Sequence, residues 1–173
     1  MLNLAFPRMS CKPALVLPLG AALIGSLLFG AGCATDAGGG RGIDSLHLFS
    51  VPVALDLDGL AGPDGFSVTL YASAATQARG IHITRGAMEI LMFDGALESA
   101  VKTNAAPRRV WTFTPAELKK FAIKTSLGTG YRFTPRWGDT PPLASRVTIV
   151  ARLVSPRQPS VQSAPTTIAV TAK

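Results

Sequence analysis

The sequence predicts a mainly β protein, a single antiparallel β-sandwich of about seven strands with one short helix. Three observations lead to this class. Apolar and polar residues alternate with period two in several short segments, turn signals such as Asp-Gly separate those segments, and a single segment carries a helix start signal. The chain has 173 residues, of which 47% are hydrophobic, enough to form a core beneath an amino-terminal appendage.

The strands are predicted where the alternation is regular, because it places one face of a strand on a core and the other toward solvent. Residues 88–93 are apolar on both faces after Glu89, so we expect this strand in the middle of a sheet. The full set of predicted strands is 51–57, 66–72, 88–93, 110–113, 131–137, 147–153 and 166–170, with a further short one at 81–84.

The helix signal follows residues 110–113. Thr114 is a good N-cap residue, Pro115 suits the first helical position, and Glu117 is the partner that a capping box needs. We expect a helix of about ten residues that ends before Gly128 and packs Leu118 and Phe121 inward against the sheets.

The chain before residue 33 has the layout of a secretory signal segment. Arg8 and Lys12 give a basic start, residues 14–31 are uncharged and apolar, and small residues precede Cys33. Residues 33–45 are rich in glycine and small polar residues, which predicts a flexible tether. Residues 46–173 form the expected β-sandwich domain.

The motif FGAG-Cys33 resembles the lipobox of bacterial lipoproteins, with Gly30 where that family usually has leucine. The resemblance implies that Cys33 carries a lipid on its thiol, begins the mature protein after cleavage, and is acylated, as by palmitate, on its new amino group. Each buried methylene contributes about 0.8 kcal/mol, so several acyl chains anchor a protein firmly. The alternative is an ordinary signal peptide or an uncleaved anchor with an incidental cysteine.

The residues after Cys33 indicate which of two bacterial membranes would hold the lipoprotein. In bacteria with two membranes, an aspartate directly after the lipidated cysteine usually retains a lipoprotein in the inner membrane. Here Ala34 follows the cysteine, and Asp36 comes two positions later. The resemblance therefore implies the outer membrane, at its periplasmic or surface face, rather than the inner membrane.

The carboxy-terminal part resembles immunoglobulin-like and fibronectin-type domains. Residues 147–170 have the pattern of the last hairpin of such domains, and Tyr131, which opens a predicted strand, is similar to their tyrosine corner. The resemblance implies an immunoglobulin-like form of the sandwich.

The positions of the cysteines limit which bonds the domain can form. Cys11 and Cys33 both precede the domain, so the domain has no disulfide and no cysteine-bound metal.

The second half of the chain is strongly basic. From Lys102 onward, 12 lysines and arginines stand against two acidic residues. They are spread over strands and turns without a nucleic-acid motif, which favours a solvated basic surface near anionic phospholipid or glycan over nucleic acid as partner. No cofactor is expected.

The acidic stretch 56–65 is the one motif with metal-binding character. Asp56, Asp58 and Asp64 could offer oxygen ligands to Ca²⁺. Three positions of the EF-hand template are nevertheless filled by unsuitable residues, namely Leu60, Ala61 and Ser67. Since Asp and Gly suit turn dihedrals, a connection between two strands explains the same residues. We expect a turn, with calcium as the weaker alternative.

No catalytic constellation is recognisable. His47 and His82 are separated by a predicted hairpin, and there is neither a serine elbow nor a phosphate-binding loop. Among the aromatic residues, Trp111 is expected to face the core. Trp137 is the better candidate for an exposed ring, and with Arg136 and His82 it could offer a ligand surface on which sugar rings stack. The alternative is that Trp137 belongs to the core, as aromatic residues of sandwiches more often do.

These features predict a cell-envelope lipoprotein that acts as a non-enzymatic binding or assembly module, held on the membrane through Cys33. Its partner would be another envelope protein or a glycan. The alternative is an envelope hydrolase or a glycan-binding accessory protein that uses residues 134–142 and His82. Carboxylates converging on His82 would favour the enzyme, whereas an exposed Trp137 beside a sheet would favour the binder.

Overall fold

The computed structural model describes residues 42–97, 105–156 and 158–170. Within these ranges the chain is mainly β, as predicted, and the signal segment, Cys33 and most of the expected tether lie outside them. The described elements are β1 (Ser45–Ser50), β2 (Val68–Ser73), β3 (Ala87–Asp94), β4 (Arg109–Phe113), α1 (Pro115–Leu118), the 3₁₀ helix η1 (Lys119–Phe121), β5 (Ala122–Thr125), β6 (Gly128–Phe133), β7 (Arg146–Val154), β8 (Val161–Gln162) and β9 (Thr166–Ala169).

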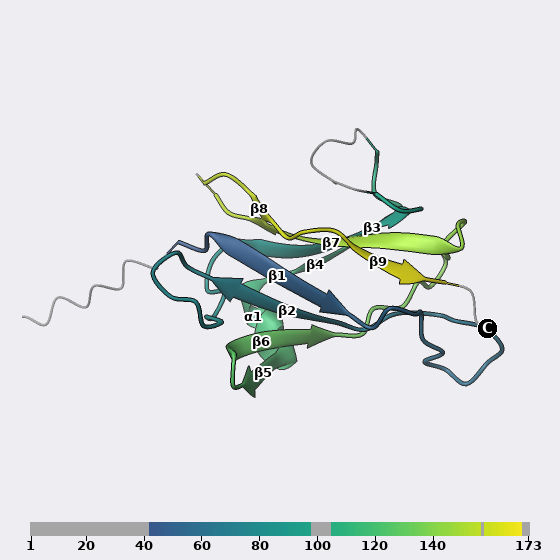
Figure 1. Ribbon diagram of the computed structural model, residues 1–173, viewed down its shortest axis with the longest axis horizontal. Helices are drawn as coiled ribbons and strands as arrows, with labels where there is room; N and C mark the ends of the chain where they lie inside the picture. The colour runs from purple at the N-terminus through teal and green to yellow at the C-terminus, as the bar shows by residue number, and fades with distance from the viewer. Residues whose placement is uncertain (1–41, 98–104, 157, 171–173) are drawn as a thin grey trace, which may run out of the picture. The chain divides into compact units, whose positions relative to one another are not determined.

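The strands form two antiparallel sheets that lie one over the other (Figure 1). The first sheet has the order β1-β2-β6-β5. The second has the order β4-β3-β7-β8, and β9 also pairs with β7. The strands β8 and β9 share one edge of β7, because β8 pairs with its carboxyl end and β9 with its amino end.

One hydrophobic core fills the space between the sheets. Leu70 and Tyr131 from the first sheet meet Ile90 and Ile149 from the second, and all four are 1% exposed or less. The period-two alternation identifies the inward residues of β2 and β7, because successive side chains of a strand point to opposite faces.

Strand β3 lies in the middle of its sheet, as its sequence predicts, between β4 and β7. Its second face is also covered, since Leu91 and Phe93 form a small buried cluster with Val150 of β7. On the same face, Glu89 pairs with Arg152 at 2.7 Å. The sequence alone offered no partner for this carboxylate.

The predicted strand at residues 51–57 is wrong. The first strand is β1, which begins at Ser45 within the expected tether, and Asp44 is already bonded through its backbone N–H to the Ser73 carbonyl at 3.0 Å. Beyond β1 the chain crosses toward the second sheet, where the Ala169 N–H donates to the Pro52 carbonyl at 2.9 Å. Val53 is therefore exposed rather than part of the core.

The helix starts as predicted but is shorter. The capping box is present, with the Thr114 hydroxyl accepting from the Glu117 N–H and the Glu117 carboxylate accepting from the Thr114 N–H. After Leu118, which is buried, the chain tightens into η1 and then extends as β5. Phe121 packs on Phe113 and Phe133, with ring centroids 5.3 and 5.0 Å apart. These contacts hold the chain against the sheet at the point where the helix ends.

Two further segments differ from the predicted strands. Strand β6 ends at Phe133, because Pro135 has no N–H to continue the ladder. Residues 81–84 form no strand. Instead the Ile83 N–H donates to the Tyr131 hydroxyl at 2.7 Å, which ties two segments that lie 48 residues apart.

Within the described ranges, none of the helices combines the length and the hydrophobicity that crossing a membrane requires.

Candidate functional site

Trp137 is buried, so the core alternative holds for this residue and it forms no exposed platform. Its side chain is 3% exposed and stacks on Phe66 with centroids 5.4 Å apart. The indole N–H donates to the Pro63 carbonyl at 2.9 Å, which satisfies the polar end of the ring. An indole in this position belongs to the core and has no free face for a sugar ring.

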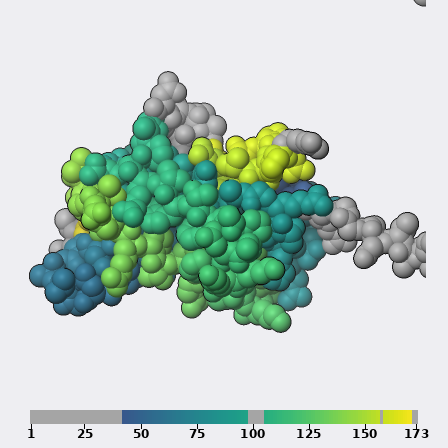
Figure 2. Space-filling model, turned by 180° about the vertical axis from the view of Figure 1, so that it is seen from behind, coloured from purple at the N-terminus to yellow at the C-terminus, as the bar shows by residue number. Residues whose placement is uncertain are grey.

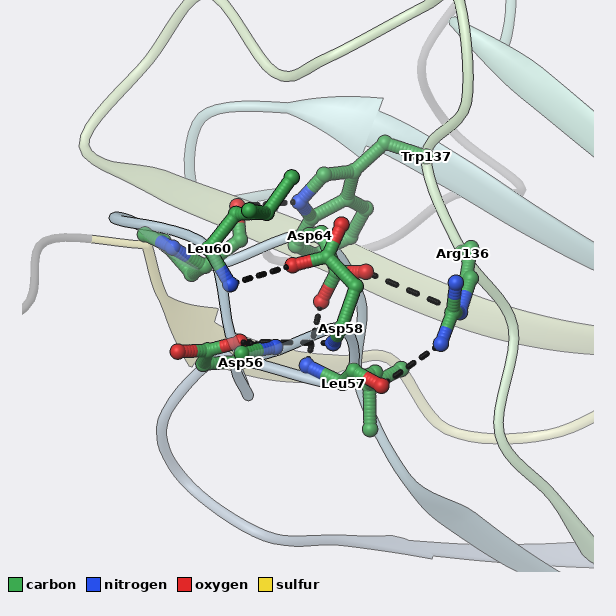
Figure 3. Close-up of polar contacts among 9 residues, drawn as sticks. Asp56, Leu57, Asp58, Leu60, Asp64, Arg136 and Trp137 are labelled. Carbon is green, nitrogen blue, oxygen red and sulfur yellow. Dashed lines mark hydrogen bonds and ion pairs between the residues drawn. The ribbon is translucent and has the colours of Figure 1, made fainter.

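Arg136, the neighbour of Trp137, holds a loop in place. Its guanidinium donates to the Leu57 carbonyl at 2.6 Å and lies 3.6 Å from the Asp64 carboxylate (Figure 3). The backbone of the same segment also binds this loop, since the Trp137 N–H donates to the Asp64 carbonyl at 2.8 Å. Residues 136 and 137 therefore bind the 56–65 loop. This loop projects from the sheets and forms the blue surface in Figure 2.

The three aspartates of that loop come together. Asp56, Asp58 and Asp64 each place one carboxylate oxygen within 4.8 Å of the other two. These carboxylates already accept backbone hydrogen bonds: Asp56 from the Gly59 N–H at 2.8 Å, Asp58 from the Leu60 N–H at 2.9 Å, and Asp64 from the Leu57 N–H at 2.6 Å.

Asp56 and Asp58 accept from residues two or three positions later, as aspartates that shape turns do, whereas Asp64 accepts across the loop from Leu57. A calcium ion would need about six to eight oxygen ligands, and here the Arg136 guanidinium lies beside Asp64. The hydrogen bonds and the ion pair within the loop thus account for all three aspartates.

His82 is exposed and lies away from these carboxylates. Its Nε2 contacts the Thr129 hydroxyl at 3.3 Å. In the part of the chain that the structure describes, the aspartate cluster is the one group of three or more such metal-binding side chains, and it contains neither His82 nor His47. The structure does not bring Trp137, Arg136 and His82 into a common ligand surface.

A different pair of aromatic residues lies on the outer face of the first sheet. Phe49 of β1 stands edge-on to Tyr71 of β2, with ring centroids 6.0 Å apart. The Phe49 side chain is 56% exposed, and Leu127 beside the same hollow is 59% exposed. Contiguous exposed apolar side chains on a protein surface can mark an interaction site.

The Tyr71 ring lies over Gly130, the residue of β6 with which Tyr71 pairs. A Cβ atom at position 130 would lie 2.8 Å from Tyr71 Cε1, so the ring can lie there only because residue 130 is glycine. The Tyr71 hydroxyl lies 3.3 Å from the Thr125 hydroxyl. Since Thr125 donates its own proton to the Gly128 carbonyl at 3.1 Å, Tyr71 is the donor of this pair.

Polar groups border this aromatic pair. His47 Nε2 lies 3.2 Å from the Ser73 hydroxyl, and both residues line an open hollow of about 100 Å³ together with Phe49, Tyr71 and Leu127. Phe49 pairs with Thr69 of β2, and Thr69 pairs with Arg132 of β6, so Arg132 lies in the same row across the sheet. We call Phe49, Tyr71, Leu127, His47 and Ser73 the aromatic face.

Sequence reasoning missed the aromatic face because it began the first strand too late. Once β1 starts at Ser45, Leu46 and Leu48 point inward, and His47 and Phe49 point outward. The alternation of residues 45–50 was the signal that could have found it.

No protein-family model, curated protein or solved structure matches this chain.

Proposed function

We propose that the protein is a cell-envelope lipoprotein, anchored through lipidated Cys33, whose β domain is a non-enzymatic binding or assembly module. The resemblance of FGAG-Cys33 to a lipobox and the basic, apolar segment before it support the anchor. Ala34 after the cysteine supports the outer membrane as its location.

We also propose that the two sheets form an immunoglobulin-like sandwich. The order β1-β2-β6-β5 corresponds to strands A-B-E-D of that fold, and β4-β3-β7-β8 corresponds to an additional C′ strand followed by C, F and G. In this correspondence Tyr131 lies in strand E, whereas a tyrosine corner lies in strand F. The proposal therefore rests on strand order and not on Tyr131.

The aromatic face is the observation that supports a binding role. Phe49 is mostly exposed, and its partner Tyr71 lies over Gly130 with its hydroxyl bonded to Thr125. Aromatic side chains have few rotatable bonds and a large apolar area, so they lose little conformational freedom when a partner covers them.

Glycan binding is a second form of this function, and the same face favours it. The ring of Phe49 offers an apolar surface to a sugar, while the exposed His47 at its border offers a hydrogen-bonding group to hydroxyls. The hydrolase alternative has no comparable support, because His82 contacts Thr129 and does not join the aspartate cluster.

The two cysteines allow a matched test of the anchor. We expect Cys33→Ser to abolish labelling by a clickable fatty acid and to release the protein from the outer-membrane fraction. Cys11→Ser, which changes the other cysteine, should retain both the label and the location. Persistent membrane association of the Cys33→Ser protein would support an uncleaved anchor and contradict the proposal.

The aromatic face is tested by retention on a peptidoglycan column and by photo-crosslinking from position 49 in the membrane-bound protein. Phe49→Ala should weaken the interaction about fivefold, from the stacking energy of one aromatic ring. Leu143→Ala, which removes another exposed apolar side chain, is the control. Glycan retention that depends on Phe49 supports the glycan form, whereas a protein adduct supports the assembly form. Equal behaviour of the two variants in both assays would overturn the role of this face.

A further inference from the structure

A second hollow lies apart from the aromatic face, between residues 82–84 and α1. It encloses about 530 Å³ and is lined by His82, Ile83, Thr84, Pro115, Ala116, Lys119 and Tyr131. We call it the Tyr131 pocket. Figure 2 shows this side of the molecule, where the green surface around α1 adjoins the teal surface of the segment before β3. Pockets of this volume are typical of sites for small molecules.

Tyr131 brings a buried hydrogen-bond donor to this pocket. Its side chain is 1% exposed, and its hydroxyl accepts from the Ile83 N–H at 2.7 Å. No acceptor for the hydroxyl proton is found among the described residues. Burial raises the pKa of Tyr131, and the Ile83 hydrogen bond opposes that change only in part, so the hydroxyl keeps its proton at neutral pH. A buried O–H without an acceptor favours a ligand that supplies one.

The charge around the pocket points to the same kind of ligand. Lys119 lines it, and no carboxylate is among its described lining residues. Glu117, the nearest acid along the chain, directs its carboxylate to Thr114, whose N–H and hydroxyl it accepts at 2.8 and 2.9 Å. The walls formed by Ile83, Pro115 and Ala116 are apolar, so they suit a hydrocarbon body.

We propose that the Tyr131 pocket binds a small organic carboxylate. The apolar body of the ligand packs on Ile83, Pro115 and Ala116, and its carboxylate accepts from the Tyr131 hydroxyl and the Lys119 ammonium. This inference uses elements other than the aromatic face and does not depend on the lipid anchor.

Octanoate and octanol form a matched pair of probes, since they share a hydrocarbon chain and differ in the charge of the head group. Titration of the protein with each, followed by the amide resonances, should show that octanoate shifts the Ile83 N–H and binds more tightly than octanol. Lys119→Gln should weaken octanoate about threefold, as expected for an exposed charge, and should leave octanol unchanged. Lys120→Gln, which removes an exposed charge one residue away, should have no effect.

Tyr131→Phe provides a second test and should weaken octanoate about tenfold. Because this change also removes the partner of the Ile83 N–H, its unfolding midpoint must be measured in parallel, and the Lys119→Gln comparison holds even if Tyr131→Phe fails to fold. Octanoate and octanol binding equally, octanoate shifts confined to residues outside the pocket, or equal effects of Lys119→Gln and Lys120→Gln would each overturn the proposal.

Discussion

Gly65, in the loop that Arg136 binds, has no space for a side chain. A Cβ atom there would collide with the Pro135 carbonyl and lie 2.5 Å from Leu57 Cδ1. Gly65→Ala should therefore lower the free energy of unfolding by about 1–3 kcal/mol, the usual cost of inserting atoms into a packed site. Urea denaturation measures this loss. Gly42→Ala, where a Cβ would meet nothing within 4 Å, should change the free energy little; equal losses in both variants would contradict the close fit.

The aspartates of the same loop give a prediction about calcium. Each already accepts a backbone N–H, and Asp64 also faces the Arg136 guanidinium. We therefore expect the thermal midpoint of unfolding to be the same in excess calcium and in excess chelator. A midpoint that rises with calcium, and no longer rises in Asp58→Asn, would show instead that the cluster binds the ion.

At the scale of elements, the capping box of α1 makes a prediction about pH. Hydrogen bonds from the Thr114 backbone and then from its hydroxyl lower the pKa of Glu117 below its ordinary value of 4.5. The ionised carboxylate thus stabilises the fold above pH 4.5, and this contribution is lost as the pH falls through the lowered pKa. In an NMR titration, Thr114→Ala should move the Glu117 midpoint up toward 4.5.

Thr114→Ala should also lower the free energy of unfolding at neutral pH by about 1 kcal/mol, as for the loss of an N-cap. Thr134→Ala, another exposed threonine, is the control. Thr114→Ala keeps the backbone N–H, so an unchanged Glu117 midpoint would show that the Thr114 hydroxyl does not lower this pKa.

The elements also show where sequence reasoning succeeds. Strands β2, β3, β4, β7 and β9 follow from local sequence patterns. In each of them the alternation or the apolar run matches the face or faces that are more buried than the rest of the strand. The segment 122–125 was expected to continue a helix and instead forms β5, since pairing with β6 outweighs helix propensity. The segment 51–57 alternates as a strand would, yet it crosses between the sheets.

At the scale of the whole molecule, the core found among the described residues lies within the β domain. Every residue of the main buried cluster lies between Leu46 and Ile168. A fragment comprising Gly38–Lys173 should therefore unfold in a single cooperative transition. Its unfolding midpoint should equal that of a longer fragment that begins at residue 33 and carries Cys33→Ser. Calorimetry measures both. A lower midpoint or a broadened transition for the shorter fragment would mean that residues before 38 contribute to the fold.

The sequence by itself determined the β class, the position of most strands, the start of α1 and the features that suggest a lipid anchor. These depend on neighbouring residues, whose alternation, turn chemistry and capping act locally. Only the tertiary structure decided that Trp137 is buried while Phe49 is exposed, and that Tyr131 reaches Ile83 beside a pocket. The physical reason is that alternation separates two faces of a strand, but the partner strand and the segments that cross over it decide which face is covered.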